Sequence, residues 1–485
     1  MMTGILTSLL PSGKAAMAFH FVTVSAVFAG NVYLLWNIAP ANLRFTYAAG
    51  ILPHPWGNEL AAGPLEAALA LTFLAVMMLC VLGGSKGIFE DVGADKQNLY
   101  FIMCDLLLAS LLAMVYTNDA FTAYVFIEIN TISACALVMA KDAGETLVAT
   151  IRYLMMSLLG SGMFLMGLTF TYHITGHLLL INIHEQLGQI IASGAYRLPV
   201  TVILGLMTMG LCLKSALFPF HTWLPDAHAS ATTASSAILS GLVLKGYIVL
   251  LIKVIFCMFG EENYRALHAG DILLVLGGAA MIAGSVMAIK ENHIKRMIAY
   301  SSVAQIGYIY LGLGLGGTAA VTAAVYQIMV HAFAKPLLFL CAGELAEVSG
   351  HRKQMYYLRG AAHRARLAGI GFTLGALSMI GLPLLGGFAV KFFLADAALA
   401  GGWRMWAALG ALAVSSVLNA LYYLPAVVQI WTVMDHGEDD LPKLPRAYPG
   451  DAAGFAILAL MVCCVLLGVC CAPVASLLSA GLKLL

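Results

Sequence analysis

Long apolar stretches alternate with short polar connections along almost the whole chain. A membrane-spanning helix needs about 20 mostly apolar residues, and 13 stretches of this kind can be marked. Their approximate limits are 15–37, 62–83, 98–117, 120–140, 150–173, 199–220, 232–257, 270–289, 297–315, 318–346, 368–398, 405–432 and 453–481. The stretch before Pro11 would cover only about 16 Å of a core roughly 30 Å thick. The pattern predicts an all-α polytopic membrane protein with about 13 transmembrane helices.

The composition supports a chain solvated by the lipid bilayer. Hydrophobic residues make up 61% of its 485 positions and charged residues 10%, against about 25% charged residues in a soluble domain. The net charge of +1 argues against nucleic acid as a partner. The 10 cysteines lie mostly in apolar stretches without CxxC-type spacing, which favours small core residues over a metal site. No dinucleotide glycine motif or haem-type histidine pair is evident, so we expect no cofactor and no metal.

Positively charged residues fall in alternate loops. One set of loops carries 14 of them: Lys86, Lys96, Lys141, Arg152, Lys290, Lys295, Arg296, Arg352, Lys353, Arg359, Arg364, Arg366, Lys443 and Arg446. The other set carries 4: Arg44, Arg197, Arg265 and Arg404. Lys and Arg stay on the cytoplasmic side of membranes. We therefore expect a multi-pass protein of the inner (cytoplasmic) membrane, with its N-terminus cytoplasmic and its C-terminus outside.

Ionisable residues interrupt several of the predicted spans. They are Glu128, Lys214, Lys245, His331, Lys335 and Lys391. Each would cost roughly 2.5–3.5 kcal/mol at a helix centre on insertion scales. A structural ion pair or a lysine reaching the interface could explain one such residue, but six at similar depth favour a function. Desolvated lysines beside a carboxylate, and a histidine, suit a proton relay.

Helix-breaking residues stand beside three of these lysines: Pro219, Pro336, and Pro383 with Gly386 and Gly387. A proline within a span frees a backbone carbonyl, and broken helices survive in membranes where they line a polar cavity. A simple kink is the alternative at any one of them. Breaks beside both Lys214 and Lys391 also suggest two related halves, since paired interrupted helices are typical of transporters with internal repeats.

Four ordered motifs within about residues 60–430 carry a resemblance to a known family. They are "LKSALFPFHTWLPDAHASA", "SGLVLK", "IKRMIAYSSVAQIGYIYLG" and "HAFAKPLLFLCAGEL". The chain resembles the antiporter-like subunits shared by respiratory complex I, membrane-bound hydrogenases and Mrp-type sodium/proton antiporters. The segments "YVFIEI" and "VAQIGYI" look closer to the branch that holds the D-type Mrp subunits and the membrane-bound hydrogenases. The resemblance implies a central hydrophilic axis formed by the six ionisable residues named above.

The resemblance also implies a division of the chain. Peripheral helices would occupy residues 1–97, and two inverted five-helix repeats, each a half-channel, would occupy 98–257 and 258–432. A loop and a last helix would follow at 433–485. The two half-channels would open toward opposite sides of the membrane.

Four further residues are candidates for an ion entrance or for coupling to a neighbouring subunit. His221, Asp226 and His228 follow the break after Lys214, although a polar loop cap explains them equally well. Gln305 stands where many complex I subunits carry a histidine, and it could join a relay only through hydrogen bonds. Asp105 lies within a span but outside the family axis.

Three functions are compatible with these residues. The first is an ion-translocating subunit, for protons or sodium, of a redox-driven respiratory or hydrogenase-type complex that carries no redox centre itself. The second is a subunit of an Mrp-type secondary sodium/proton antiporter. The third, a membrane scaffold or quinone-site subunit, is disfavoured by the buried charges. We expect other membrane subunits, including antiporter-like ones, as partners, and lysine and histidine favour protons because sodium prefers oxygen ligands.

Overall fold

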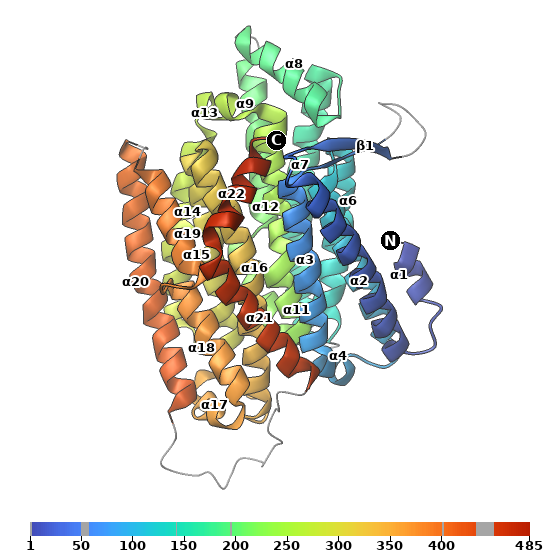
Figure 1. Cartoon of the computed structure of the whole chain (residues 1–485), viewed down its shortest axis with the longest axis vertical. Helices are drawn as coiled ribbons and strands as arrows, with labels where there is room; N and C mark the ends of the chain where they lie inside the picture. The colour runs from blue at the N-terminus through green and yellow to red at the C-terminus, as the bar shows by residue number, and fades with distance from the viewer. Residues whose placement is uncertain (1, 50–57, 142, 195, 400–401, 433–450) are drawn as a thin grey trace.

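The protein is a long helical bundle (Figure 1). The computed structural model describes all residues except 1, 50–57, 142, 195, 400–401 and 433–450. Within this part of the chain, 12 helices are long and apolar enough to cross a membrane. The predicted span 368–398 is divided into two shorter helices, α18 (Arg366–Ile380) and α19 (Gly386–Ala398). The all-α polytopic fold and its approximate number of spans are confirmed.

The N-terminal part contains a β-hairpin that the apolar pattern did not predict. Its helices are α1 (Met2–Thr7), α2 (Gly13–Ile38), α3 (Pro64–Gly83) and α4 (Ser85–Asp91). Between α2 and α3 lies an antiparallel hairpin of β1 (Phe45–Ala49) and β2 (Asn58–Ala62). Its strands are too short, and their alternation too weak, to stand out among apolar helices.

The next part contains a broken helix and a helix with irregular turns. Its elements are α5 (Gln97–Tyr116), α6 (Ala120–Met139), α7 (Gly144–Thr175), α8 (Leu180–Ala192), α9 (Arg197–Lys214), η1 (Phe220–Trp223) and α10 (Leu224–Ser230). A continuous helix follows, made of α11 (Thr233–Ile238), η2 (Leu239–Val243), α12 (Leu244–Lys253) and η3 (Val254–Phe259). Both η2 and η3 are π-helical turns, which are frequent at functional sites.

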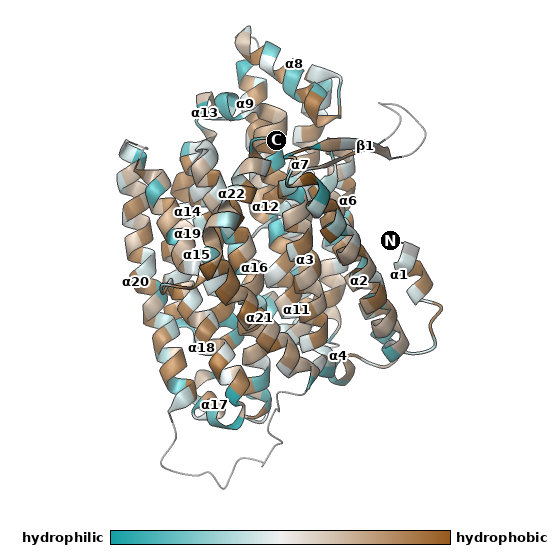
Figure 2. Ribbon diagram, in the orientation of Figure 1, coloured by the Kyte–Doolittle hydropathy of each residue, from teal (hydrophilic) through white to brown (hydrophobic). Residues whose placement is uncertain are grey.

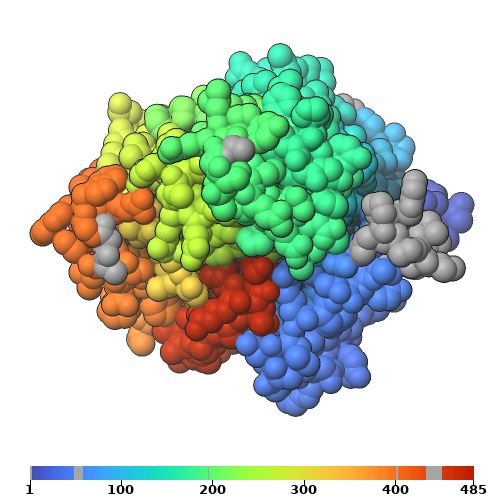
Figure 3. All heavy atoms as spheres, turned by 90° about the horizontal axis from the view of Figure 1, so that it is seen from above, coloured from blue at the N-terminus to red at the C-terminus, as the bar shows by residue number. Residues whose placement is uncertain are grey.

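The C-terminal part completes the bundle. Its elements are α13 (Glu261–Ala266), α14 (Ala269–Lys290), α15 (Ile294–Leu315), α16 (Gly317–Glu347), η4 (Met355–Leu358), α17 (Ala361–Arg364), α18, α19, α20 (Trp403–Trp431), α21 (Ala452–Val469) and α22 (Cys471–Leu482). The last two helices pack against α3, so that the C-terminal helices lie beside the N-terminal part of the chain (Figure 3). The break expected at Pro336 is wrong, because α16 continues through it.

The centre of the bundle is formed by three helices. In the most apolar 18-residue segment of each spanning helix, 94% of the residues are buried in the α11–η3 helix, 94% in α15 and 89% in α16. The corresponding share is only 33% in α20 and 17% in α2. The outer helices therefore expose apolar side chains to lipid, and their ribbons are mostly coloured as hydrophobic in Figure 2. Polar residues in the three central helices are consequently shielded from lipid.

The two sets of loops, strongly and weakly positive, lie at opposite ends of the bundle. The short helices α4 and α17 lie at one end, while α8, α13 and the hairpin lie at the other (Figure 1). The loops around α4 and α17 belong to the strongly positive set, so the predicted alternation of charge is reproduced in space. Lys443 and Arg446 lie outside the described residues.

Candidate functional site

Two broken helices each end beside a lysine. Helix α9 ends at Lys214, and the chain resumes in η1 and α10. Helix α18 ends at Ile380, and α19 carries Lys391 back against that end, where its ammonium donates to the free Ile380 carbonyl. The C-terminus of a helix carries a partial negative charge. Each break thus supplies a favourable place for a cation, and these two of the expected breaks are confirmed.

Lys214 lies fully buried beside α6. Its Nζ donates to Thr131 Oγ1 at 2.7 Å and lies 5.2 Å from the centre of the Tyr247 ring. Glu128 on α6 interacts with Lys214 electrostatically but forms no direct ion pair with any described residue. The predicted acid and base are therefore neighbours that interact without a direct hydrogen bond or ion pair.

Lys245 lies at the centre of the molecule, just after the π turn η2. The side chain is fully buried, and Nζ donates to the backbone carbonyl of Ser240 within that turn. A π turn widens the helix and leaves carbonyls free for side chains. The wider turn therefore places a hydrogen-bond acceptor where Lys245 can reach it.

His331 and Lys335 lie one turn apart on α16, as predicted. Lys335 Nζ donates to the Ile298 carbonyl at 3.0 Å, to Ser301 Oγ at 2.5 Å and to Tyr423 Oη at 3.3 Å. His331 is fully buried, and neither of its ring nitrogens has a partner among the described residues. Buried polar atoms normally have a partner, so His331 has free hydrogen-bonding capacity in the core.

Lys391 is half-buried near the end of the row. Besides the Ile380 carbonyl, its Nζ donates to Ser416 Oγ at 2.9 Å and lies 5.6 Å from the centre of the Tyr308 ring. Gly381 at the break has φ +92°, and an added Cβ there would lie 2.9 Å from Lys391 Cδ. A glycine is thus required both by the backbone conformation and by the close approach of the lysine.

Hydroxyl and amide groups that the sequence did not identify fill the intervals between these ionisable residues. From Lys214, Thr131 leads to the Tyr247 hydroxyl at 3.4 Å, which donates to Asn130 at 2.9 Å. Nothing in the sequence separates such residues from Ser and Thr that bond their own helix. The contacts alone show that Tyr247 continues the row toward the α11–η3 helix.

A second interval links Lys245 to Lys335. The hydroxyls of Ser240 and Ser302 lie 3.0 Å apart, and Ser302 donates to the Ile298 carbonyl at 3.0 Å. Lys335 donates to that same carbonyl. The Ser240 carbonyl that accepts from Lys245, two serine hydroxyls and the shared Ile298 carbonyl therefore lie between the two lysines.

A third interval leads from Lys335 toward Lys391. The hydroxyls of Ser301 and Tyr423 lie 2.6 Å apart, and the Tyr422 ring packs against Tyr423 at 4.6 Å. Tyr422 donates to Asn419 at 2.6 Å, and Asn419 donates to Tyr308 at 3.3 Å. The Tyr308 ring then lies beside Lys391. We call the whole set, from Glu128 and Lys214 through these groups to Lys391, the polar row.

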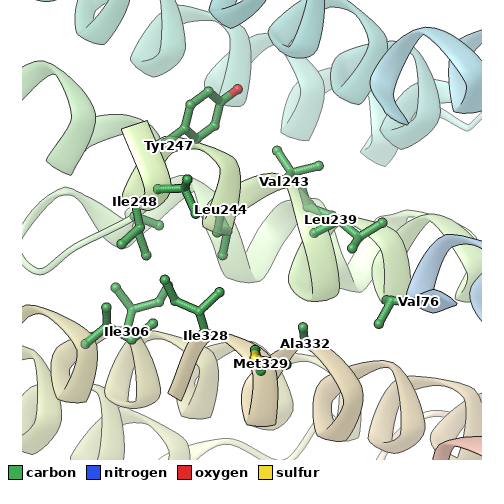
Figure 4. Close-up of a cluster of buried hydrophobic side chains, with 14 of the residues drawn as sticks. Val76, Leu239, Val243, Leu244, Tyr247, Ile248, Ile306, Ile328, Met329 and Ala332 are labelled. Carbon is green, nitrogen blue, oxygen red and sulfur yellow. The ribbon is translucent and has the colours of Figure 1, made fainter. Parts of the chain in front are cut away.

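An apolar layer also packs at the centre of the bundle. Leu244 and Ile248 on α12 face Ile306 on α15 and Ile328 on α16 (Figure 4). Tyr247 points to the opposite side of α12 in the same view. This layer lies between α12 and the helices α15 and α16, on the side of α12 away from Tyr247.

The residues that follow the first break make separate contacts. Asp226 accepts from Arg152 at 2.6 Å and from Arg296 at 2.8 Å, which ties α10 to α7 and α15. His221 stacks on Phe218 with ring centres 5.4 Å apart. His228 is fully buried and faces α16.

Gln305 and Asp105 each have a local partner. Gln305 accepts from Gln327 on α16 at 2.7 Å. Asp105 pairs with His20 on α2 at 2.6 Å, away from the polar row. Sequence reasoning overlooked Lys253, which is buried and donates to the Thr117 carbonyl at 2.8 Å. In the described part of the chain, no group of three or more His, Cys, Asp and Glu side chains could hold a metal ion.

Comparisons with known proteins agree with this fold. The model of the family described as "NADH:quinone oxidoreductase/Mrp antiporter, TM" matches residues 117–418. NADH-quinone oxidoreductase subunit N of Desulforudis audaxviator is 32% identical over 413 residues, 84% of this chain and 80% of that protein. A subunit of the Na(+)/H(+) antiporter of Alkalihalophilus pseudofirmus is 27% identical, over 73% of this chain and 71% of that protein. A chain of the membrane-bound sulfane sulfur reductase, an archaeal respiratory membrane complex, has a TM-score of 0.85 and 25% identity, over 99% of this chain and 94% of that one.

Proposed function

This chain belongs to the NADH:quinone oxidoreductase/Mrp antiporter membrane family, and from that premise we propose that it translocates protons along the polar row. The observation that carries the proposal is the composition of the row itself. Buried ionisable groups, from Glu128 to Lys391, are separated by hydroxyls, amides and carbonyls that can pass or orient a proton. A structural ion pair would need none of these intermediates.

The ion is assigned from the chemistry of the row. Its charged members are four lysines, one histidine and one glutamate, whereas sodium is held by several oxygen ligands. Protons are therefore the proposed ion, with sodium as the alternative.

The proposed setting is a multisubunit complex in the cytoplasmic membrane. Structures that this chain resembles come from such assemblies, so the partners are other membrane subunits, including antiporter-like ones. We favour a redox-driven respiratory or hydrogenase-type complex, because the relative from Desulforudis audaxviator is an oxidoreductase subunit. An Mrp-type secondary antiporter is the second candidate, favoured by the likeness to the Na(+)/H(+) antiporter of Alkalihalophilus pseudofirmus. Genes for iron–sulfur subunits beside this one would favour the first, and genes for small Mrp-type membrane subunits the second.

The test is ion flux in purified, assembled complexes that carry Lys214→Ala, Glu128→Ala or Lys391→Ala. Each should abolish translocation while the complex remains intact, because each removes a proton-binding group from the row. Lys290→Ala is the matched control, since Lys290 is exposed at the end of α14. Wild-type flux in an assembled Lys214→Ala complex would refute the proposal.

A further inference from the structure

A polar pocket opens at the end of the bundle that carries α4 and α17. Its volume is about 410 Å³. It lies where the ends of α3, α4 and α16 meet the start of α11 and α15, and its walls contain both acidic and basic side chains. None of the residues assigned to the polar row lines it.

Two ion pairs frame the rim of this pocket. Lys86 on α4 pairs with Glu347 on α16, and Lys141 after α6 pairs with Asp91 on α4 at 2.8 Å. The hydrogen bond to Glu347 raises the pKa of Lys86. Helix α4 is thereby tied to two neighbours, and these four rim charges already have partners.

The deeper groups in the pocket lack partners of opposite charge. Glu344 lies on α16, half-buried, and its carboxylate forms no ion pair or hydrogen bond with the described residues. Lys295 at the start of α15 is 2% exposed, and its Nζ donates only to the Ala231 carbonyl, at 3.1 Å. An acid that faces water and a buried amine thus share one cavity.

A single buried histidine lies between the pocket and the polar row. His228 stacks on Phe339 of α16, with ring centres 4.6 Å apart, and both of its nitrogens lack partners among the described residues. Lys295, which lines the pocket, and Lys335 and Lys245, which belong to the polar row, are close enough to act on His228, and their positive charges would make an imidazolium there give up its proton readily. A fully buried imidazole with two free nitrogens can accept a proton on one side and donate it on the other.

We propose that this pocket is the site where a proton enters the polar row, with Glu344 as its first acceptor and His228 as the link inward. This inference rests on the proposed function. The Glu344 carboxylate takes a proton from water and releases it to the water of the pocket, from which the neutral amine of Lys295, which lines the same pocket, takes it up. The protonated Lys295 gives it to His228, and the imidazolium passes it to Lys245 or His331. Each group returns to its starting state when the proton leaves.

The first test compares neutral replacements of two glutamates one turn apart on α16. In assembled complexes, Glu344→Gln should lower ion flux at least about tenfold, because a group that accepts and donates protons is lost. Glu347→Gln removes the same charge from the rim and should leave most of the flux. Glu344→Asp, which restores a carboxylate, should recover part of it.

Lys214→Ala serves as the reference that separates two kinds of failure. If Lys214→Ala abolishes flux and Glu344→Gln does not, the entrance is wrong and the proposed function stands. If neither changes flux, both are wrong. If Glu347→Gln lowers flux as much as Glu344→Gln does, the effect belongs to surface charge and the entrance is refuted.

The second test measures access from water rather than activity. Thr233 lines the pocket and is half-buried. In the assembled complex, a membrane-impermeant thiol reagent should modify Thr233→Cys from the face that bears α4 and should then block ion flux. The wild-type complex, treated with the same reagent, shows how much labelling and loss of flux come from the native cysteines. Complete protection of Thr233→Cys, or modification from the opposite face, would overturn the proposal.

Discussion

The buried ammonium groups of the polar row are held by neutral oxygen atoms. Lys335 contacts a carbonyl and two hydroxyls, and Lys214 contacts a threonine hydroxyl. A hydroxyl can accept from an ammonium or donate to a neutral amine, so it serves the lysine in both protonation states. A directly paired carboxylate would fix the charged state instead.

The sequence predicted the ionisable residues of this row but not the groups between them. A lysine within an apolar span is conspicuous because its burial is costly. Serine and threonine are not, because they can satisfy themselves by bonding the carbonyl one turn back, as Thr150 and Thr171 do. Only tertiary packing distinguishes those residues from Thr131 or Ser301.

The hydroxyl of Tyr423 gives a prediction at this scale. Tyr423→Phe removes the oxygen that contacts both Ser301 and Lys335 and keeps the ring in place. Ion flux in the assembled complex should fall several-fold, because Lys335 loses one route toward Lys391. Tyr326→Phe, a buried tyrosine that bonds the Leu467 carbonyl away from the row, is the control. Equal flux in the two variants would contradict the assigned role.

At the scale of elements, irregular backbone occurs where the charged side chains need it. Lys214 and Lys391 stand at broken helices, and Lys245 follows a π turn. The breaks were predictable from Pro219 and from Pro383 with its glycines. The π turn and the continuity of α16 were not predictable, because they depend on contacts between helices. Pro336 packs against Gly241 of η2, where an added Cβ would lie 2.6 Å from Pro336 Cγ.

The start of α15 gives a prediction about pH. His293 caps this helix by accepting from the Arg296 amide at 3.4 Å, which requires a neutral imidazole. Burial, reinforced by Lys353, lowers the pKa of His293 from 6.5 to about 4. The unfolded chain therefore binds the proton first, so this contribution to stability is present above pH 6.5 and is lost as the pH falls toward 4.

His293→Asn keeps a capping side chain that does not titrate. Thermal unfolding of the purified protein should therefore lose less stability between about pH 7 and about pH 4.5 in this variant than in the wild type. His268→Asn is the control, because His268 is largely exposed at the other end of the bundle. An identical pH dependence of Tm in the wild type and His293→Asn would exclude the capping histidine as a source of acid sensitivity.

For the whole molecule, the charges of the loops predicted which connections share an end of the bundle. This worked because every span reverses the chain, so each loop's side follows from its position in the order. The hairpin β1–β2 and the partial helix α1 escaped prediction, since neither has a length or periodicity that distinguishes it. The limits of the two repeats stay predictions.

Orientation in the membrane can be measured with single added cysteines. Asp95→Cys lies beside α4, and Glu262→Cys lies in α13 at the opposite end, both at exposed positions. An impermeant thiol reagent should modify Asp95→Cys only in inverted vesicles and Glu262→Cys only in right-side-out vesicles. The reverse pattern would show that the strongly positive loops face outward.

The depth of the polar row has an electrical consequence. Glu128, Lys245 and His331 all lie near the middle of their helices, so the row runs roughly parallel to the membrane plane. Carrying one elementary charge across a membrane at about 100 mV involves about 2.3 kcal/mol of work. A proton travelling sideways along the row crosses almost none of that voltage. Membrane voltage would therefore act mainly on the short vertical steps that join the row to each face, where it favours one direction of travel.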